Sequence, residues 1–126
     1  MPVAAAHKSD RGVGLDLLEI ERMERALARR PNLALRLFRP GELAYSDSRG
    51  RPAAHLAARF CAKEAVSKAL GLAVFAPLDI EVLAGGADVG LALHGAARER
   101  AAQLGVEVEV SLTHTRGLAG AVAVLR

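Results

Sequence analysis

The sequence predicts an α+β domain that contains an antiparallel sheet of about five strands, one long helix and several shorter helices. Residues 52–70 place apolar side chains on nearly every side of a helix, which predicts a long helix that is packed all round. Residues 106–115 alternate between apolar and polar side chains, which is typical of a half-buried strand. The helices lie mostly in the first half of the chain and the strands in the second, and this segregation indicates the α+β class.

The first half is expected to contain one strand, three helical segments and a loop. Pro31 ends the first helix, because the residue before a proline avoids helical backbone angles. In chain order these elements are the strand Gly12–Leu18, the helix Ile20–Arg30, a helical turn at Leu33–Leu37, the short helix Pro40–Tyr45 and the loop Ser46–Pro52.

The second half opens with the long helix, which is expected to span Pro52–Leu70. Pro52 suits the first turn of a helix, and Gly71 suits its C-terminal exit. The remaining elements are the strand Asp79–Ala84, the turn Gly85–Gly86, the strand Val89–Leu93, the helix Ala96–Leu104, the alternating strand of residues 106–115, the turn Arg116–Gly117 and the strand Leu118–Leu125.

The chain of 126 residues is long enough for one domain with a substantial core. Residues 1–11 have no apolar period and are expected to form a flexible tail, so the domain is expected to cover residues 12–126. Aromatic residues make up only 3% of the chain and tryptophan is absent. The core must therefore be built from alanine, leucine and valine.

The chain has no apolar run near the roughly 18 residues that a membrane span requires, and residues 1–12 lack the long apolar stretch of a secretory signal. Its single cysteine, Cys61, excludes an internal disulfide and a cysteine-based metal cage. We therefore expect a cytoplasmic protein without a membrane partner, in which Cys61 fills the core rather than acting as a nucleophile.

The positive charge is concentrated in the first half of the chain. Residues 1–52 hold ten Lys or Arg and seven Asp or Glu, whereas residues 53–126 hold seven of each, which accounts for the net charge of +3. Between residues 22 and 39, six arginines accompany one acid, Glu24. This excess predicts a surface for an acidic partner, with an ordinary solvated helix face as the alternative.

Two carboxylates stand in unusual settings. Asp16 ends the segment Gly12-Val13-Gly14-Leu15-Asp16, and Glu64 lies within the long, packed helix, where an unpaired charge is costly. Magnesium ions are typically held by one or two protein carboxylates together with substrate phosphates. The pair therefore predicts a magnesium site, although glycines near a strand more often serve only close backbone packing.

The same helix carries three basic residues beside Glu64, namely Arg59, Lys63 and Lys68. Glu64 and Lys68 lie four residues apart and could form an ordinary intrahelical pair. Arg59 and Lys63 are like charges one turn apart, which is unfavourable unless an anion lies between them. The basic residues are therefore candidates for holding a phosphate.

His114 and Thr115 end the alternating strand and could donate hydrogen bonds to a phosphate. The alternative is that His114 is an ordinary rim residue of the core. No spacing typical of metal ligands links His114 to the other three histidines, His7, His55 and His94.

Three ordered motifs resemble the holo-acyl-carrier-protein synthase family, the small 4′-phosphopantetheinyl transferases. They are Gly12-Val13-Gly14-Leu15-Asp16-Leu17-Leu18-Glu19-Ile20, Ala58-Arg59-Phe60-Cys61-Ala62-Lys63-Glu64-Ala65 and Val110-Ser111-Leu112-Thr113-His114-Thr115, with Phe38-Arg39-Pro40-Gly41-Glu42 and Asp79-Ile80-Glu81-Val82 between them. The resemblance covers about Gly12 to Leu125 and implies the 4′-phosphopantetheinyl transferase fold.

The resemblance implies transfer of the 4′-phosphopantetheine arm from coenzyme A to a serine of apo-acyl-carrier protein, which releases adenosine 3′,5′-bisphosphate. By matching positions, Asp16 and Glu64 would be the catalytic residues that bind Mg²⁺. The remaining matched positions would face the phosphates of the co-substrate coenzyme A: Arg59, Lys63, Lys68, His114 and Thr115.

The resemblance also implies a homotrimer with sites at the subunit interfaces, so that Asp16 and His114 could serve a different site from the Glu64 of their own chain. Acyl-carrier proteins are acidic, which makes the arginine-rich helix their expected docking surface, through Arg22, Arg25 and Arg29. A separate small domain of this kind is expected to serve the carrier of fatty-acid and hence lipid biosynthesis.

Two departures from the family pattern leave alternatives open. Ala44 stands where some members have an acidic residue, so the general base is unassigned and Glu64 is ranked first. The hairpin at residues 85–90 differs from the usual Gly-x-Pro turn. A domain that binds a partner without catalysis is therefore an alternative function. A non-catalytic basic module for an acidic protein or nucleic acid is the rival, although one Tyr and three Phe offer little surface for base stacking.

Overall fold

The computed structural model describes residues 12–84 and 89–126. The predicted tail of residues 1–11 and the predicted turn Gly85–Gly86 lie outside the described residues. The elements in chain order are β1 (Val13–Glu19), α2 (Ile20–Arg29), α3 (Leu33–Leu37), α4 (Pro40–Asp47), α5 (Pro52–Leu70), the 3-10 turn η1 (Pro77–Asp79), β2 (Ile80–Leu83), β3 (Gly90–Leu93), α6 (Gly95–Leu104), β4 (Val108–His114) and β5 (Leu118–Leu125). The predicted α+β class with antiparallel strands is confirmed.

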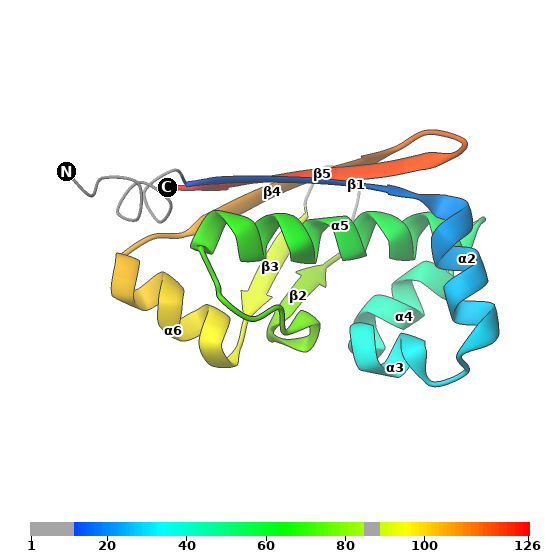
Figure 1. The fold of residues 1–126 in the computed structure, drawn as a ribbon, viewed down its shortest axis with the longest axis horizontal. Coiled ribbons are helices and arrows are strands. Elements are labelled where there is room, and N and C mark those ends of the chain that lie inside the picture. The colour runs from blue at the N-terminus through cyan, green and yellow to red at the C-terminus, as the bar shows by residue number, and fades with distance from the viewer. Residues whose placement is uncertain (1–11, 85–88) are drawn as a thin grey trace.

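Helix α5 runs through the middle of the molecule. The three-stranded sheet, in the order β1-β5-β4, covers one side of it, and the shorter helices and the β2-β3 hairpin lie on the other side (Figure 1). Thirteen of the residues of α5 are buried, which confirms the prediction of a helix packed all round. Many of them are alanines, and their small side chains allow neighbouring elements to approach closely.

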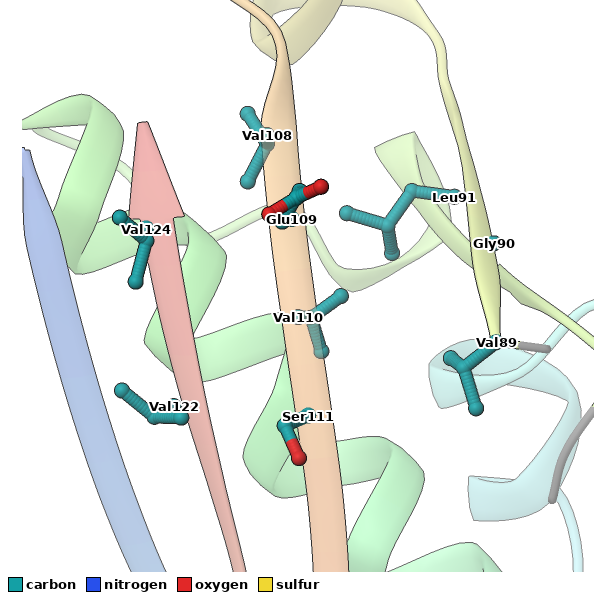
Figure 2. A pocket seen from close by; sticks show the side chains of 9 residues that line it. All are labelled: Val89, Gly90, Leu91, Val108, Glu109, Val110, Ser111, Val122 and Val124. Atoms are coloured by element: carbon teal, nitrogen blue, oxygen red, sulfur yellow. The ribbon is translucent and has the colours of Figure 1, made fainter. Parts of the chain in front are cut away.

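The five strands do not form one sheet. Strands β1, β5 and β4 are hydrogen-bonded to one another, whereas β2 and β3 form a separate antiparallel pair. A pocket of about 380 Å³ separates β3 from β4, and Figure 2 shows that mainly apolar side chains such as Leu91 and Val110 line it. The expectation of a single five-stranded sheet was wrong, because alternation predicts strands but not which of their edges bond.

Gly14 brings β1 into backbone contact with α5. A Cβ atom at this position would lie 1.9 Å from the carbonyl oxygen of Ala65, so no larger residue fits without moving the helix or the strand. Side chains alternate along a strand, so Asp16 points to the same face as Gly14. The close-packing explanation of Gly14 is therefore correct, and this packing is also what brings Asp16 to the helix.

The opposite face of the sheet is apolar and exposed. Val13, Leu15 and Leu17 on β1 are 51%, 60% and 61% exposed, and no described element lies over them (Figure 1). On β5, Leu118 and Val124 add to this surface, with exposures of 40% and 43%. We call these five residues the outer sheet face. Within residues 12–84 and 89–126, no helix is long and apolar enough to cross a membrane.

Candidate functional site

Asp16 and Lys68 meet where β1 crosses α5. The Nζ atom of Lys68 lies 3.4 Å from Oδ1 of Asp16 and donates a hydrogen bond of 3.0 Å to the carbonyl oxygen of Leu15. Both side chains reach solvent, since 55% of the Lys68 side chain and 20% of the Asp16 side chain are exposed. Lys68 therefore forms its ion pair with Asp16 on the strand. The helix spacing had instead suggested an ion pair between Lys68 and Glu64.

Glu64 completes an acidic group with Asp16. Partial burial raises the pKa of Glu64, and the negative charge of Asp16 raises that pKa further, while Lys68 opposes the shift. A carboxylate whose pKa is raised by a second carboxylate gains most from a cation bound between them. We call Asp16, Glu64 and Lys68 the carboxylate cluster.

The carboxylate cluster fits a magnesium ion. Two carboxylates leave coordination positions for substrate phosphates, which is the usual arrangement for this ion. The described residues hold no cluster of three or more His, Cys, Asp or Glu that would instead form an all-protein cage. Asp16 and Glu64 of one chain lie close enough for the charge of Asp16 to raise the pKa of Glu64, and the expectation of sites shared between subunits stays a prediction.

Cys61 lies beside this cluster but is fully buried, with an exposed fraction of 0%. Its Sγ atom lies 3.6 Å from the carbonyl oxygen of Ala119. Burial, followed by the charge of Asp16, raises the pKa of the Cys61 thiol to about 12. This placement supports a core role for Cys61, because the reactive form of a cysteine is the thiolate.

We therefore expect native protein to resist alkylation by iodoacetamide at pH 8, and protein in urea to react at once. Intact mass over time measures the added carbamidomethyl group. Rapid labelling of the folded protein would show that Cys61 is more accessible or more acidic than its position implies.

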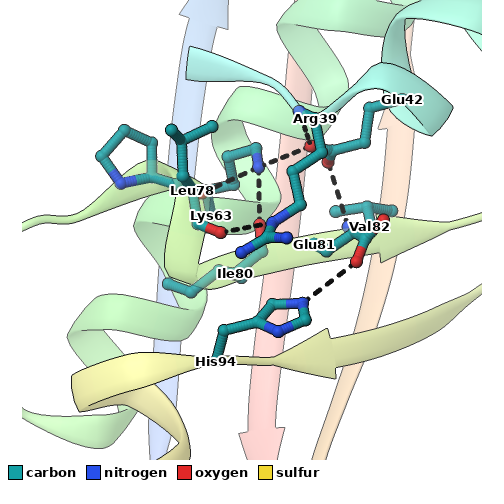
Figure 3. A network of polar contacts seen from close by, with 9 residues as sticks. Arg39, Glu42, Lys63, Leu78, Ile80, Glu81, Val82 and His94 are labelled. Atoms are coloured by element: carbon teal, nitrogen blue, oxygen red, sulfur yellow. Dashed lines mark hydrogen bonds and ion pairs between the residues drawn. The ribbon is translucent and has the colours of Figure 1, made fainter. Parts of the chain in front are cut away.

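Lys63 is buried in an ion pair with Glu42 (Figure 3). Its Nζ atom lies 2.8 Å from Oε1 of Glu42, and both side chains are 0% exposed. The same ammonium group donates hydrogen bonds to the carbonyl oxygens of Pro77 and Ile80. Burial lowers the pKa of Lys63, and the charge of Glu42 opposes that shift.

Both carboxylate oxygens of Glu42 accept hydrogen bonds. The backbone N–H of Arg39 donates to Oε1 at 2.9 Å, and the N–H of Val82 donates to Oε2 at 3.0 Å. Glu42 thus ties α4, α5 and β2 together. The sequence indicated that an anion lies near Arg59 and Lys63, and the structure shows that Glu42 is the anion paired with Lys63. The expected phosphate contact of Lys63 is at odds with this buried position.

Arg59 and His114 belong to a second group, which we call the histidine pocket. It has a volume of about 270 Å³ and is lined by Tyr45, His55, Ala58, Arg59, Val89, Leu112, Thr113 and His114. The guanidinium of Arg59 lies over the ring of Tyr45, 4.1 Å from its centroid. The ring of His55 makes edge contacts with Tyr45 and with His114, at centroid distances of 5.8 Å and 5.4 Å.

Arg59 is nearly inaccessible, with an exposed fraction of 2%. One of its terminal nitrogens donates a hydrogen bond to the carbonyl oxygen of Ala84. Its Nε atom is buried and has no hydrogen-bond partner among the described residues. A buried guanidinium nitrogen without a partner is costly, and a bound acceptor would relieve that cost.

Thr115 lies at the exposed turn between β4 and β5. Its Oγ1 accepts hydrogen bonds from the backbone N–H groups of Leu118 and Gly117, at 3.1 Å and 3.4 Å. These contacts stabilise the turn that follows His114. Thr115 therefore supports the strand end, and the residue is exposed at the surface.

The three expected docking arginines lie on α2 and are exposed. Arg22, Arg25 and Arg29 recur at intervals of three and four residues, so they form one stripe along the helix. Arg25 pairs with Glu21 at 2.5 Å, whereas Ile20 and Met23 on the other face are buried.

The sequence did not single out three residues that the structure places in these groups. Glu42 appeared only inside a family motif, and Tyr45 only as the end of a predicted helix. His55 was noted only for lacking the spacing of a metal ligand. The position of His55 four residues before Arg59, on the same helix face, was the available signal.

The model of the 4′-phosphopantetheinyl transferase superfamily matches residues 12–122. The chain belongs to this superfamily. Among curated relatives, it is 47% identical over 116 residues to the holo-[acyl-carrier-protein] synthase of Moorella thermoacetica, covering 89% of this chain and 91% of the relative. It is 45% identical over 117 residues to that of Streptomyces coelicolor, covering 90% and 94%. The transferase family and enzyme class predicted from the motifs are thereby confirmed.

Solved structures of the superfamily share the fold. The acyl carrier protein synthase of Mycobacterium tuberculosis is 36% identical, with a TM-score of 0.71, and the alignment covers 91% of this chain and 96% of that one. The holo-[acyl-carrier-protein] synthase of Helicobacter pylori, solved in complex with coenzyme A, is 25% identical with a TM-score of 0.76, and the alignment covers 90% and 99%.

Proposed function

We propose that this phosphopantetheinyl transferase moves the 4′-phosphopantetheine arm of coenzyme A to a serine of apo-acyl-carrier protein, at a site where Asp16 and Glu64 hold Mg²⁺. The observation that carries the proposal is the carboxylate cluster, in which two acids of one chain meet beside Lys68. Two relatives were solved in complex with coenzyme A, which supports coenzyme A as the co-substrate of this chain. We further propose that the carrier is that of fatty-acid synthesis.

In this reaction the serine oxygen attacks the phosphorus that bears the pantetheine arm, and adenosine 3′,5′-bisphosphate leaves. A magnesium ion bound by Asp16 and Glu64 would stabilise charge on the phosphoryl oxygens. Lys68 supplies a positive charge at the same place. Arg59 and His114 are proposed to bind other phosphate groups of the coenzyme, because their pocket offers buried positive charge and the unpaired Nε atom.

The proton of the serine needs an acceptor. Glu64 remains our first candidate, because it lies at the proposed metal site. Ala44 is exposed on α4 and cannot accept a proton.

The test is the intact mass of an apo-acyl-carrier protein after incubation with this protein and coenzyme A, with Mg²⁺ or with a chelator. We expect one added phosphopantetheine with Mg²⁺, and none with chelator or with Asp16→Asn. Absence of the mass shift with several folded carriers would reject the transfer. A shift that survives Asp16→Asn would mean that the metal lies elsewhere.

We also propose that the protein is a homotrimer in which the outer sheet face is covered. Val13, Leu15 and Leu17 are exposed to a degree that is unusual for large apolar side chains in one contiguous patch. Leu15 and Leu17 directly flank Asp16 on β1, and β1 is an edge of its sheet. A neighbouring chain packed here would therefore lie next to the carboxylate cluster, which supports sites at subunit interfaces.

Replacing Leu17 by glutamate should dissociate the oligomer, because a charge at a buried interface is costly. Sedimentation or light scattering gives the mass of the assembly. The matched control is Val74→Glu, since Val74 is 75% exposed outside the sheet. A wild-type protein that is monomeric at micromolar concentration would contradict the trimer.

Reversing the charge of Arg22 should raise the KM for the acyl-carrier protein several-fold and weaken its dependence on salt, while the affinity for coenzyme A stays the same. Arg22 is exposed on α2 and forms no ion pair within the described residues, unlike Arg25. Arg98→Glu, an exposed change on α6, is the control. An unchanged KM for Arg22→Glu would remove α2 from the docking surface.

A further inference from the structure

The histidine pocket collects positive charge, and the acid that acts on Arg59, Glu42, lies outside the pocket lining. None of the eight residues that line it is an acid. Arg59 and Arg49 lie over the ring of Tyr45, at 4.1 Å and 4.6 Å from its centroid, and the imidazoles of His55 and His114 contact each other beside it. The buried Nε atom of Arg59, which has no partner among the described residues, is a donor ready for an anion.

His55 occupies the middle of this arrangement. Its ring is half-buried between Tyr45 from α4 and His114 from β4, and Arg59 lies one turn further along α5. Burial lowers the pKa of His55, and the positive charges of His114, Arg59 and Arg49 lower it further, whereas the carbonyl of Gly50 opposes the shift. In the free protein, His55 is therefore harder to protonate than an exposed histidine.

We infer that His55 is the proton-accepting member of a phosphate subsite in the histidine pocket, so that binding of a phosphate group beside Arg59 and His114 is coupled to protonation of His55. The subsite takes a phosphate dianion, such as a phosphate group of coenzyme A or of the released adenosine 3′,5′-bisphosphate. This inference rests on the proposed placement of coenzyme phosphates against Arg59 and His114.

The direction of the coupling follows from the charges. A dianion in the pocket offsets the repulsion from the surrounding positive groups, so protonated His55 becomes favourable when the ligand is bound. By linkage, a ligand that promotes protonation binds more tightly as the pH falls. If His55 takes up one full proton, the affinity for the phosphate ligand rises by up to about tenfold for each unit by which the pH falls.

The test is isothermal titration calorimetry of adenosine 3′,5′-bisphosphate, without Mg²⁺ or carrier protein, in buffers of different ionisation enthalpy between pH 6.5 and 8.5. The dependence on buffer gives the number of protons taken up. His55→Phe keeps an aromatic ring between Tyr45 and His114 but cannot titrate. His94→Gln is the control, because His94 pairs with Glu81 outside the pocket.

A second variant, His55→Gln, also removes the titrating imidazole. We expect the wild type and all three variants to stay folded by circular dichroism, with proton uptake in the wild type and in His94→Gln, and with uptake lost in both His55 variants. Equal uptake by His55→Phe and the wild type would overturn the inference, as would nucleotide binding without uptake or no nucleotide binding at all. The mass-shift assay decides the transfer separately, so a protein that modifies its carrier without this proton uptake refutes only the role of His55.

Discussion

Replacing Glu64 by glutamine should lower phosphopantetheine transfer on the order of a hundredfold or more and, near neutral pH, raise the melting temperature of the protein. The activity falls because the carboxylate cluster loses one of the two oxygen ligands proposed for Mg²⁺. The stability rises because glutamine keeps the shape of the side chain without the charge that burial and Asp16 disfavour. Opposite effects on activity and stability are typical of a site held ready for a cation.

The stability gain depends on pH. The pKa of Glu64 is raised in the folded protein, so its contribution to stability is full below the ordinary glutamate pKa of 4.5 and is lost as the pH rises through the folded value. Glutamine does not undergo this loss. The gain in melting temperature should therefore be absent at acid pH and reach a plateau above the raised pKa.

Thermal melts in chelator from pH 4 to pH 8 measure this effect, and added Mg²⁺ should stabilise the wild type but not Glu64→Gln. The control is Glu99→Gln, an exposed change on α6 that should alter neither property. A variant that melts below the wild type at pH 7.5 would show that Glu64 is stabilised by a partner rather than strained by Asp16.

Removing Lys63 alone should destabilise the protein strongly. Lys63→Met leaves Glu42 buried without its positive partner, and breaking a buried pair in this way costs about 3–5 kcal/mol. The double change Glu42→Gln/Lys63→Met removes both charges and should be less destabilising than Lys63→Met. Urea unfolding, monitored by circular dichroism, gives the free energy of unfolding of each variant.

Lys68→Met supplies the matched comparison on the same helix. The Lys68 side chain is 55% exposed and that of Asp16 is 20% exposed, so losing this ion pair should cost much less than losing the fully buried one. If Lys63→Met proves as mild as Lys68→Met, the buried pair does not stabilise the fold. If the folded double variant binds coenzyme A more weakly than the wild type, this would support a contact between Lys63 and a phosphate of the coenzyme.

Much of the site could be predicted from short-range patterns. The packed helix was visible in its apolar residues, and an acid such as Glu64 on that helix needed a cation nearby. The glycine spacing before Asp16 indicated close packing of a strand. The inferences about the helix and the strand succeed because helix and strand periods depend on residues that are close in sequence.

Other contacts depended on where distant segments meet. The like charges of Arg59 and Lys63 predicted an anion, but not that Glu42, 21 residues before Lys63, supplies it. Likewise, the alternation of residues 106–115 predicted a strand, but not that its free edge faces β3 across a pocket instead of bonding to it.

By itself, the sequence determined the fold class, the elements, the transferase family and the two acids at the carboxylate cluster, because these follow from local periodicity and from ordered motifs. Only the tertiary structure decided which charges are satisfied by the protein. It buried Lys63 with Glu42, left Arg59 with an unpaired nitrogen and placed His55 between Tyr45 and His114. The physical reason is that the energy of a charge depends on its burial and on its partners, and both are set by the packing of α5 against elements from the whole chain.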